Sequence, residues 1–289
     1  MGDFSIGWLR LREPVDRRSR NATVATALRV AFASRHNVRV VDIGCGTGAN
    51  LRATAPLLGP EQDWTLLDND IALLDAARHT IAAWANEAEQ VPDGLRLIKD
   101  GKAIRVQFRR CDIAGDPGGS MAEDASLVMA SAFFDLVSAS FIEKLVAAVV
   151  HRKAAFYTVL TYDGAQQWLP ASPLDARISR AFNEHQKADK GFGPSAGPGA
   201  SALLRQAFDA AGYQTEFGDS PWNLGSGDTD LMDQLADGVV AAVAETGQVA
   251  AAEIAAWRGF ARYEVRVGHQ DVLALPAGWR VGPTGAASA

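Results

Sequence analysis

Cysteine is scarce in this chain of 289 residues, which contains only Cys45 and Cys111. Two cysteines cannot form the disulfide framework of a protein of this size, and no Cys-x-x-Cys or Cys/His spacing indicates a zinc site. A compartment that keeps thiols reduced is the simplest setting for such a sequence. The first residues also lack a basic segment followed by an apolar stretch, so we expect a cytoplasmic protein without a signal peptide.

Long hydrophobic runs and an excess of positive charge are also missing. The longest aliphatic stretches, such as 145–150, are too short to cross a bilayer. Lys and Arg number 28 against 34 Asp and Glu, a net charge of −6, whereas nucleic-acid binders usually carry a basic excess. We therefore expect neither a membrane nor a nucleic acid as partner; the composition does not indicate an oligomeric state.

The charge is unevenly distributed along the chain. Residues 1–40 carry eight Arg and three acids, a net charge of +5, which leaves −11 for the remaining residues. The basic start is either a solvated helix surface or a segment that holds an acidic small molecule. Composition alone leaves both interpretations open.

Apolar periodicity predicts an alternation of strands and helices. The expected strands are 38–43, 64–67, 126–130, 154–160, 213–217 and one within 264–275 that is bulged at Gly268; the expected helices are 14–36, with Pro14 in its first turn, 71–88, 141–151, 174–188, 200–211 and most of 229–262. Asp100-Gly101 predicts a two-residue hairpin turn between strands at 95–98 and 103–106. This alternation is typical of a parallel sheet with helices on both faces.

The expected organisation is one domain with additions. Residues 1–37 would form an N-terminal helical lid, and 38–281 the main domain. A segment rich in Pro, Gly and aromatic residues, at about 164–200, interrupts the alternation and is expected to be a helical cap insertion. The small and polar tail, 282–289, is expected to be disordered.

Glycines are concentrated in the segment Val40-Val41-Asp42-Ile43-Gly44-Cys45-Gly46-Thr47-Gly48-Ala49-Asn50, between an expected strand and an expected helix. Such glycines allow the backbone to turn sharply and to approach a ligand closely. Gly44-x-Gly46-x-x-Ala49 fits the relaxed dinucleotide pattern, so an NAD-dependent oxidoreductase has to be considered.

Three acids and the third glycine favour a different cofactor. Asp42 stands inside the strand, where dinucleotide folds usually carry a small apolar residue, and Gly48 adds freedom that a pyrophosphate site does not need. Asp68 ends the next strand, where an acid in either cofactor class binds ribose hydroxyls. Asp112 ends the strand after that, where its carboxylate can receive an adenine amino group beside the backbone of Ile113. Turn chemistry at strand ends is the alternative explanation of each acid taken singly.

These segments resemble the class I S-adenosylmethionine-dependent methyltransferases. Residues 40–48 are similar to their first motif, Leu-Leu-Asp-Asn-Asp at 66–70 to their second, and Arg-Cys-Asp-Ile at 110–113 to their third. The resemblance covers about 38–160, and the final strands loosely. It implies an α/β fold with a seven-stranded, mostly parallel twisted sheet, a reversed last strand and helices on both faces.

The resemblance also implies a cofactor, S-adenosyl-L-methionine, and roles for individual residues. Gly44, Gly46 and Gly48 would pack against its amino-acid part. Asp42 would order the loop or meet the ammonium group, and Asp68 would accept both ribose hydroxyls. The other implied cofactor-site residues are Cys45 and Asn50 in and beside the glycine loop, Asn69 beside the adenine, Asp112 and Ile113 at its amino group, and Ser131 near the sulfonium. For Cys45 and Cys111 themselves, small packing residues are the expectation and a redox role the alternative.

Three further segments resemble a group of bacterial methyltransferases of this class that act on small molecules. They are Trp8-Leu9-x-Leu11-Arg12-Glu13-Pro14, the block 182–194, and Gly268-His269-x-Asp271. This resemblance gives no substrate.

The fourth motif departs from one branch of the family. Members that methylate amide or adenine amino groups usually carry Asn/Asp-Pro-Pro-Tyr/Phe, whereas this chain has Ser131-Ala132-Phe133-Phe134-Asp135. This departure argues against methylation of nucleic-acid bases or glutamine. Metal-dependent catechol methylation would need clustered acids, and Asp135 with Asp163 alone does not make a metal site, so no metal is expected.

Candidate acceptor-binding residues come from the insertion and the N-terminus. Trp168 and Trp222, with Phe182 and Phe192, would wall an apolar pocket, and core packing is the alternative. His185 is the candidate base because histidine titrates near neutrality, although a lone helical His is commonly a solvated residue. Gln186 and Lys190 would orient a polar acceptor. Arg12 and Arg18 would fold over the site, or else are surface charges.

The sequence therefore predicts an S-adenosylmethionine-dependent methyltransferase. Its acceptor atom would be O or N of a small molecule, with anionic or aromatic acceptors as the first classes to try. A protein methyltransferase, an NAD-dependent oxidoreductase and a non-catalytic cofactor-binding protein are the alternatives.

Overall fold

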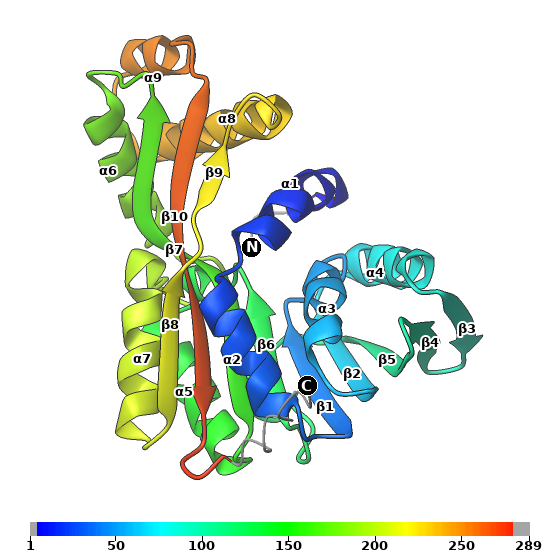
Figure 1. Ribbon diagram of the computed structural model, residues 1–289. Coiled ribbons are helices and arrows are strands. Elements are labelled where there is room, and N and C mark those ends of the chain that lie inside the picture. The colour runs from blue at the N-terminus through cyan, green and yellow to red at the C-terminus, as the bar shows by residue number, and fades with distance from the viewer. Residues whose placement is uncertain (1–4, 280–289) are drawn as a thin grey trace, which may run out of the picture.

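The computed structural model describes residues 5–279, which form a ten-stranded sheet with helices on both faces (Figure 1). Five strands run parallel in the order β5-β2-β1-β6-β7. Their bounds are β1 (Asn37–Ile43), β2 (Glu61–Asp68), β5 (Lys102–Arg110), β6 (Leu127–Ser131) and β7 (Ala155–Leu169). The last strand, β10 (Glu264–Leu275), lies antiparallel between β7 and β8 (Gln214–Asp219). The mostly parallel sheet and the reversed last strand are confirmed.

Three strands exceed the predicted seven. The hairpin β3 (Glu87–Val91) and β4 (Gly94–Lys99) extends the sheet beyond β5, and β9 (Trp222–Leu224) pairs with one end of β10. The Asp100-Gly101 turn joins β4 to β5 as predicted, with both residues at positive φ. The helix expected to reach residue 88 instead ends at Trp84. The prediction extended it too far because β3 is mostly exposed and has no apolar pattern that marks it as a strand.

The N-terminal segment forms two helices rather than one. Ser5 caps α1 (Ile6–Ser19), and Asn21 caps α2 (Ala22–Phe32) by accepting hydrogen bonds from the amides of Thr23 and Val24. The prediction that Pro14 lies in a first helical turn is wrong, since it lies inside α1. Only α2 buries a full apolar stripe. Because α1 has no such stripe, the apolar periodicity of the sequence did not show where α1 begins.

The sheet faces are covered by helices that pack against two apolar cores. The covering helices are α3 (Ala49–Thr54), α4 (Ile71–Trp84), α5 (Ala139–His151) and α7 (Ala200–Ala210). One core contains Leu28, Trp64 and Ile81, and the other contains Leu145 and Phe208. Within residues 5–279, no helix is both long and apolar enough to cross a membrane. The tail expected to be disordered lies outside the described residues.

Strands β7 and β10 continue past the parallel sheet and carry a second layer of helices (Figure 1). We call this region, residues 163–193 and 221–267, the cap. The expected insertion supplies α6 (Asp175–Gln186), while residues 194–200 return to the sheet, where the amide of Ala196 donates to the carbonyl of Val137. The later segment adds β9, α8 (Thr229–Thr246) and α9 (Ala251–Arg258), which the sequence did not place there. Helix α1 lies between the cap and the α3/α4 side of the sheet (Figure 1).

Candidate functional site

The glycine loop connects β1 to α3 at the carboxyl edge of the sheet. Gly44, Gly46 and Gly48 all have positive φ, at +63°, +53° and +77°. A Cβ on Gly48 would lie 2.6 Å from Cδ1 of Ile81, and a Cβ on Gly44 would lie 2.9 Å from the ring of Phe133. Backbone conformation and close packing therefore both require glycine here.

Asp42 is fully buried directly before this loop. Its Oδ1 accepts a hydrogen bond of 2.7 Å from Nδ2 of Asn50, whose Oδ1 in turn accepts from Arg20 at 2.9 Å. Its Oδ2 has no partner within the described residues. Burial raises the pKa of Asp42 to about 7, although Asn50 and Arg20 oppose this shift. An unpartnered buried carboxylate oxygen suits a cationic group of a ligand.

Asp68 ties the end of β2 to the glycine loop. Its Oδ2 accepts from the amide of Gly46 at 2.9 Å, and its Oδ1 accepts from the amide of Asp70 at 3.1 Å. Burial raises the pKa of Asp68, while these backbone amides oppose the shift. Burial also raises the pKa of the Cys45 thiol, helped by the two neighbouring carboxylates. Cys45 therefore stays a neutral packing residue.

The other predicted cofactor residues lie at the same edge of the sheet, following β2, β5 and β6. Asp112 is exposed and accepts a hydrogen bond from the amide of Ala114, next to the buried Ile113. The carbonyl of Asn69 accepts from Nε of Arg110. Ser131 ends β6 and is partly exposed. The structure thus brings all of the predicted cofactor positions to adjoining strand ends.

These residues fit S-adenosylmethionine. Three glycines in left-handed conformation form a loop in which a Cβ would collide with neighbours, and an orphaned carboxylate oxygen lies directly before it. A second carboxylate, that of Asp68, lies on the adjoining strand end. No group of three or more His, Cys, Asp or Glu side chains arranged to hold a metal ion is found in residues 5–279.

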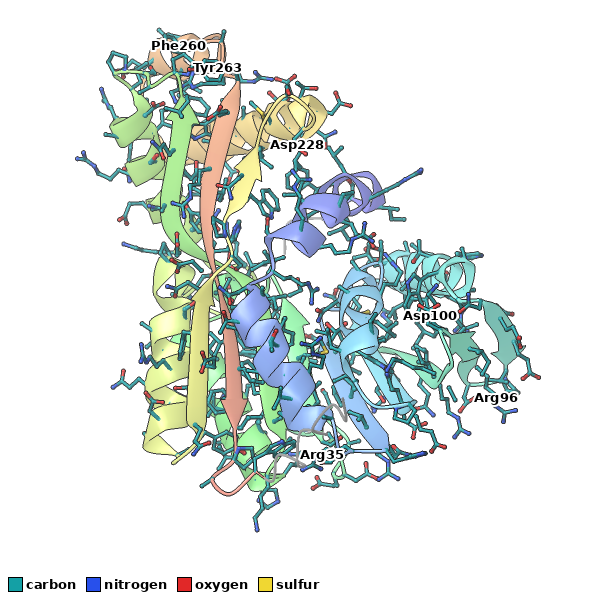
Figure 2. All side chains as sticks on the ribbon, in the orientation of Figure 1. Arg35, Arg96, Asp100, Asp228, Phe260 and Tyr263 are labelled. Atoms are coloured by element: carbon teal, nitrogen blue, oxygen red, sulfur yellow. The ribbon has the colours of Figure 1, made fainter. Side chains whose placement is uncertain are left out.

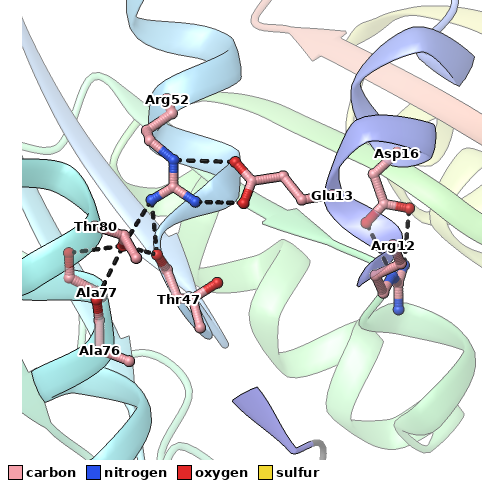
Figure 3. Close-up of polar contacts among 8 residues, drawn as sticks. All are labelled: Arg12, Glu13, Asp16, Thr47, Arg52, Ala76, Ala77 and Thr80. Atoms are coloured by element: carbon pink, nitrogen blue, oxygen red, sulfur yellow. Dashed lines mark hydrogen bonds and ion pairs between the residues drawn. The ribbon is translucent and has the colours of Figure 1, made fainter. Parts of the chain in front are cut away.

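Helix α1 is fastened over the glycine loop by a bidentate ion pair (Figure 3). Nε and Nη2 of Arg52, on α3, donate to the two carboxylate oxygens of Glu13 at 3.0 and 2.6 Å. Nη1 of Arg52 donates to the carbonyl of Thr47 and to the hydroxyl of Thr80. A Cβ on Gly46 would lie 3.2 Å from Cδ1 of Leu9, so α1 covers the loop directly. The basic N-terminal segment therefore contacts the candidate site.

A cavity of about 450 Å³ lies between α1, the ends of β6 and β7, and the cap. We call it the acceptor cavity. It brings together four of the predicted acceptor residues, Arg12, His185, Gln186 and Trp222. Phe182, also named from the sequence, lines it as well. Leu9 and Phe133 pack against the glycine loop, and the residues before them in the chain, Trp8 and Ala132, line the acceptor cavity. The glycine loop and the acceptor cavity therefore adjoin.

Trp168, Arg18 and Lys190 do not line the acceptor cavity. The ring of Trp168 is buried within the cap against Trp257, with ring centroids 5.0 Å apart, so the prediction that it walls the acceptor pocket is corrected to core packing. Arg18 reaches from α1 to Asp228, at the start of α8 (Figure 2), in an ion pair of 2.6 Å. Lys190 contacts His185 rather than the cavity: its Nζ lies 3.4 Å from Nδ1 of His185.

Two buried polar side chains of the cavity were not predicted as acceptor-site residues. Asp135 follows β6 in the short 3-10 helix η2 (Phe134–Leu136), and His269 lies on β10. They are 8% and 6% exposed, and Oδ1 of Asp135 and Nδ1 of His269 have no partner within the described residues. The sequence offered one signal for His269: it follows the expected bulge at Gly268, where the register of β10 on β7 does shift.

Backbone strain also gathers at this cavity. Ala132 and Leu160, which both line it, have positive φ of +49° and +59° although neither is glycine. The amide of Leu160 donates to Oδ1 of the buried Asp271, which helps to hold this conformation. Such outliers are costly and concentrate at ligand sites.

Comparison with known proteins gives the fold. No protein-family profile and no curated protein matches this chain. Among solved structures, a protein from Bacillus halodurans reported under a provisional methyltransferase assignment is 16% identical; the match covers 88% of this chain and all of that one, with a TM-score of 0.50. The cyclopropane synthase MmaA2 from Mycobacterium tuberculosis is 11% identical, with 94% and 95% covered and a TM-score of 0.51. The chain thus has the class I methyltransferase fold, as the sequence motifs implied.

Proposed function

We propose that this protein is an S-adenosylmethionine-dependent methyltransferase that methylates O or N of a small molecule bound in the acceptor cavity. One observation carries the proposal: a glycine loop that fits the cofactor adjoins a cavity bordered by α1 and the cap. A cavity of about 450 Å³ is in the range of sites that bury a small ligand.

The cofactor residues are proposed to act as the family resemblance implies. Gly44, Gly46 and Gly48 would accommodate the amino-acid part, and Asp42, with its free Oδ2, would meet the ammonium group. Asp68 would hold the ribose hydroxyls, and Asp112 the adenine amino group. When bound, S-adenosylmethionine supplies a methyl group already activated by the sulfonium charge, so the protein's own contribution is alignment and exclusion of water.

The residues around the acceptor cavity would provide that alignment. Trp8 and Arg12 of α1 close one side, and the α6 and α8 side chains of the cap close the other. The Glu13–Arg52 ion pair fastens α1 to α3, beside the glycine loop. His185 and Gln186 lie on α6, where they contact the acceptor from the cap side.

Titration calorimetry with S-adenosylmethionine and S-adenosylhomocysteine tests the proposal. Wild-type protein should bind both, and Asp68→Ala should weaken binding at least tenfold. Asp68→Asn, which keeps an acceptor for the loop amides, should also bind more weakly while melting at nearly the wild-type temperature. Asp124→Ala, at an exposed carboxylate paired with Arg39 away from the glycine loop, is the matched control. No binding by wild type, unchanged binding by both Asp68 variants, or co-purified nicotinamide would refute the proposal.

A further inference from the structure

We infer that Asp135 accepts the proton that the acceptor molecule loses, and that this acceptor is a largely apolar ring bearing a neutral hydroxyl or N–H group. This inference rests on the proposed methyltransferase function and deepens it. It differs from the sequence-based expectation on two points: the proton acceptor is not His185, and the acceptor is not an anion.

The carboxylate of Asp135 is placed for this role by the end of β6. The side chain is buried and lines the acceptor cavity, and its Oδ1 has no partner within residues 5–279. The backbone amide of Tyr162 stabilises the ionised form. A buried carboxylate oxygen without a donor leaves the cost of its desolvation uncompensated, unless a ligand supplies a donor. Because Asp135 borders the cavity, an acceptor O–H or N–H group bound there would supply a donor to its carboxylate.

The proton affinity of Asp135 also suits a base. Burial raises its pKa to about 6, and the positive charge of Arg12 keeps it from rising further. The side chain is then mostly ionised at neutral pH and still basic enough to take a proton during the reaction. The titratable and charged groups that face it are Arg12 from α1, Tyr162 from β7, His269 from β10 and His185 from α6.

His185 lacks a free nitrogen for the same task. Its Nε2 lies 2.9 Å from Oε2 of Glu245, and its Nδ1 lies 3.4 Å from the ammonium group of Lys190. The Glu245 carboxylate accepts a hydrogen bond from the N–H of the ring, and the Lys190 ammonium donates to the lone pair of the other ring nitrogen. His185 is therefore a positioning residue that joins α6 to α8.

The charges around the cavity disfavour an anionic acceptor. Arg12 already forms an ion pair of 2.8 Å with Asp16, and its guanidinium lies over the ring of Trp222 at 5.1 Å. Burial, reinforced by Arg12, lowers the pKa of His269 to about 3, so its imidazole is neutral. Asp135 would repel a carboxylate or phosphate that entered. The sequence-based preference for an anion rested on the total charge of residues 1–40, whereas Arg12, the arginine of this segment that lines the cavity, is already paired with Asp16.

The cavity walls favour a flat ring. Trp8 and Trp222 lie 6.3 Å apart between ring centroids, and Trp222 and His269 lie 5.2 Å apart, so aromatic faces line one side. Leu160 and Val267 add aliphatic surface. His269, whose imidazole is neutral, also borders the cavity and adds an aromatic ring without charge to its wall.

The step balances with these groups. The acceptor O–H or N–H bond breaks and its proton passes to the carboxylate of Asp135. The electron pair left on the acceptor atom forms the bond to the methyl carbon, while the electron pair of the carbon–sulfur bond stays on sulfur. Asp135 returns its proton to water after the product leaves.

Transfer of labelled methyl from S-adenosylmethionine into a fractionated metabolite extract tests the inference. The labelled product of wild type should be an O-methyl ether or N-methyl derivative of a compound that is neutral at pH 7 before methylation. Asp135→Asn should lower transfer by about 100-fold or more and leave S-adenosylhomocysteine affinity within twofold. The wild-type rate should rise with pH through about 6, and His185→Gln should keep this profile with a smaller loss of rate.

The outcomes separate the inference from the proposed function. No cofactor binding and no transfer by wild type would contradict the proposed function itself. Transfer that survives in Asp135→Asn, or a labelled methyl ester of an anionic acid, would overturn only the inference.

A binding measurement needs no turnover. 2-Naphthol should bind to the S-adenosylhomocysteine complex at least tenfold more tightly than 2-naphthoate, and Asp135→Asn should narrow that difference because it removes the repelling charge. The reverse preference, or binding of neither compound, would count against the acceptor class.

Discussion

The ion pair between Glu13 and Arg52 offers a direct test of how α1 is held over the glycine loop. Glu13→Gln keeps the shape of the side chain and removes its charge. In the folded protein, Glu13 is 27% exposed and Arg52 10% exposed, so the pair is only partly screened by water. The two oxygens accept hydrogen bonds of 3.0 and 2.6 Å from one guanidinium group. Such bidentate, charge-assisted bonds are the stronger kind.

The expected loss follows from what the substitution leaves in place. A hydrogen bond to a charged group contributes about 1.5–3 kcal/mol. The glutamine amide still accepts one bond, and Arg52 keeps its bonds to Thr47 and Thr80, so its charge is not left without partners. We expect α1 docking to weaken by about 2 kcal/mol, which corresponds to roughly 30-fold in the docking equilibrium.

Hydrogen exchange of the α1 backbone amides measures that equilibrium. Amides on the inner face of α1 should exchange roughly 30-fold faster in Glu13→Gln, while the strands β1 and β6 keep their protection. Arg18→Gln is the control, because Arg18 is 47% exposed in its pair with Asp228 and such surface pairs contribute little. Equal exchange in wild type and Glu13→Gln would refute the assignment of the clamp, and so would an equal effect of the Arg18 substitution.

Three further predictions concern the pH dependence and packing of the protein. Folding raises the pKa of Asp42 from an ordinary 3.8 to about 7. Its contribution to stability is therefore complete below pH about 4 and is lost as the pH approaches 7. In urea unfolding at pH 4, 5.5 and 7, the free energy of unfolding should decline less with rising pH in Asp42→Asn than in wild type. Gly48→Ala should destabilise the protein by about 1–3 kcal/mol more than Gly101→Ala, since both glycines have positive φ but only a Cβ on Gly48 meets Ile81; an equal loss in thermal melts would contradict this. Trp168→Leu should lower the free energy of unfolding by about 2 kcal/mol and leave cofactor affinity unchanged, because its ring is buried inside the cap; a calorimetric change in affinity would contradict it.

Local patterns were sufficient for the cofactor half of the site. In a parallel sheet the carboxyl ends of the strands share one edge, so acids at or next to the ends of neighbouring strands must lie near one another. Asp42, Asp68 and Asp112 follow this rule, and the glycine loop lies beside them. The hairpin turn at Asp100-Gly101 and the bulge at Gly268 were equally local and appear as predicted.

The acceptor half depended on contacts that no local pattern contains. Asp135 and His269 are far apart in the sequence and meet because the sheet order places β10 beside β7, which adjoins β6. His185 looked suitable by residue type, and only the positions of Glu245 and Lys190 show that its two nitrogens are occupied. Trp168 looked like a pocket wall and packs inside the cap instead.

By itself, then, the sequence determined the sheet class, the glycine loop and the edge proposed to bind the cofactor, because strand periodicity, left-handed glycines and strand-end acids act over a few residues. Tertiary structure alone decided which side chains face the acceptor. It also decided that two arginines of α1, Arg12 and Arg18, are paired with Asp16 and Asp228. Burial and pairing of charges arise from segments that fold together, so the total charge of the N-terminal segment did not predict the charge that a bound molecule would meet.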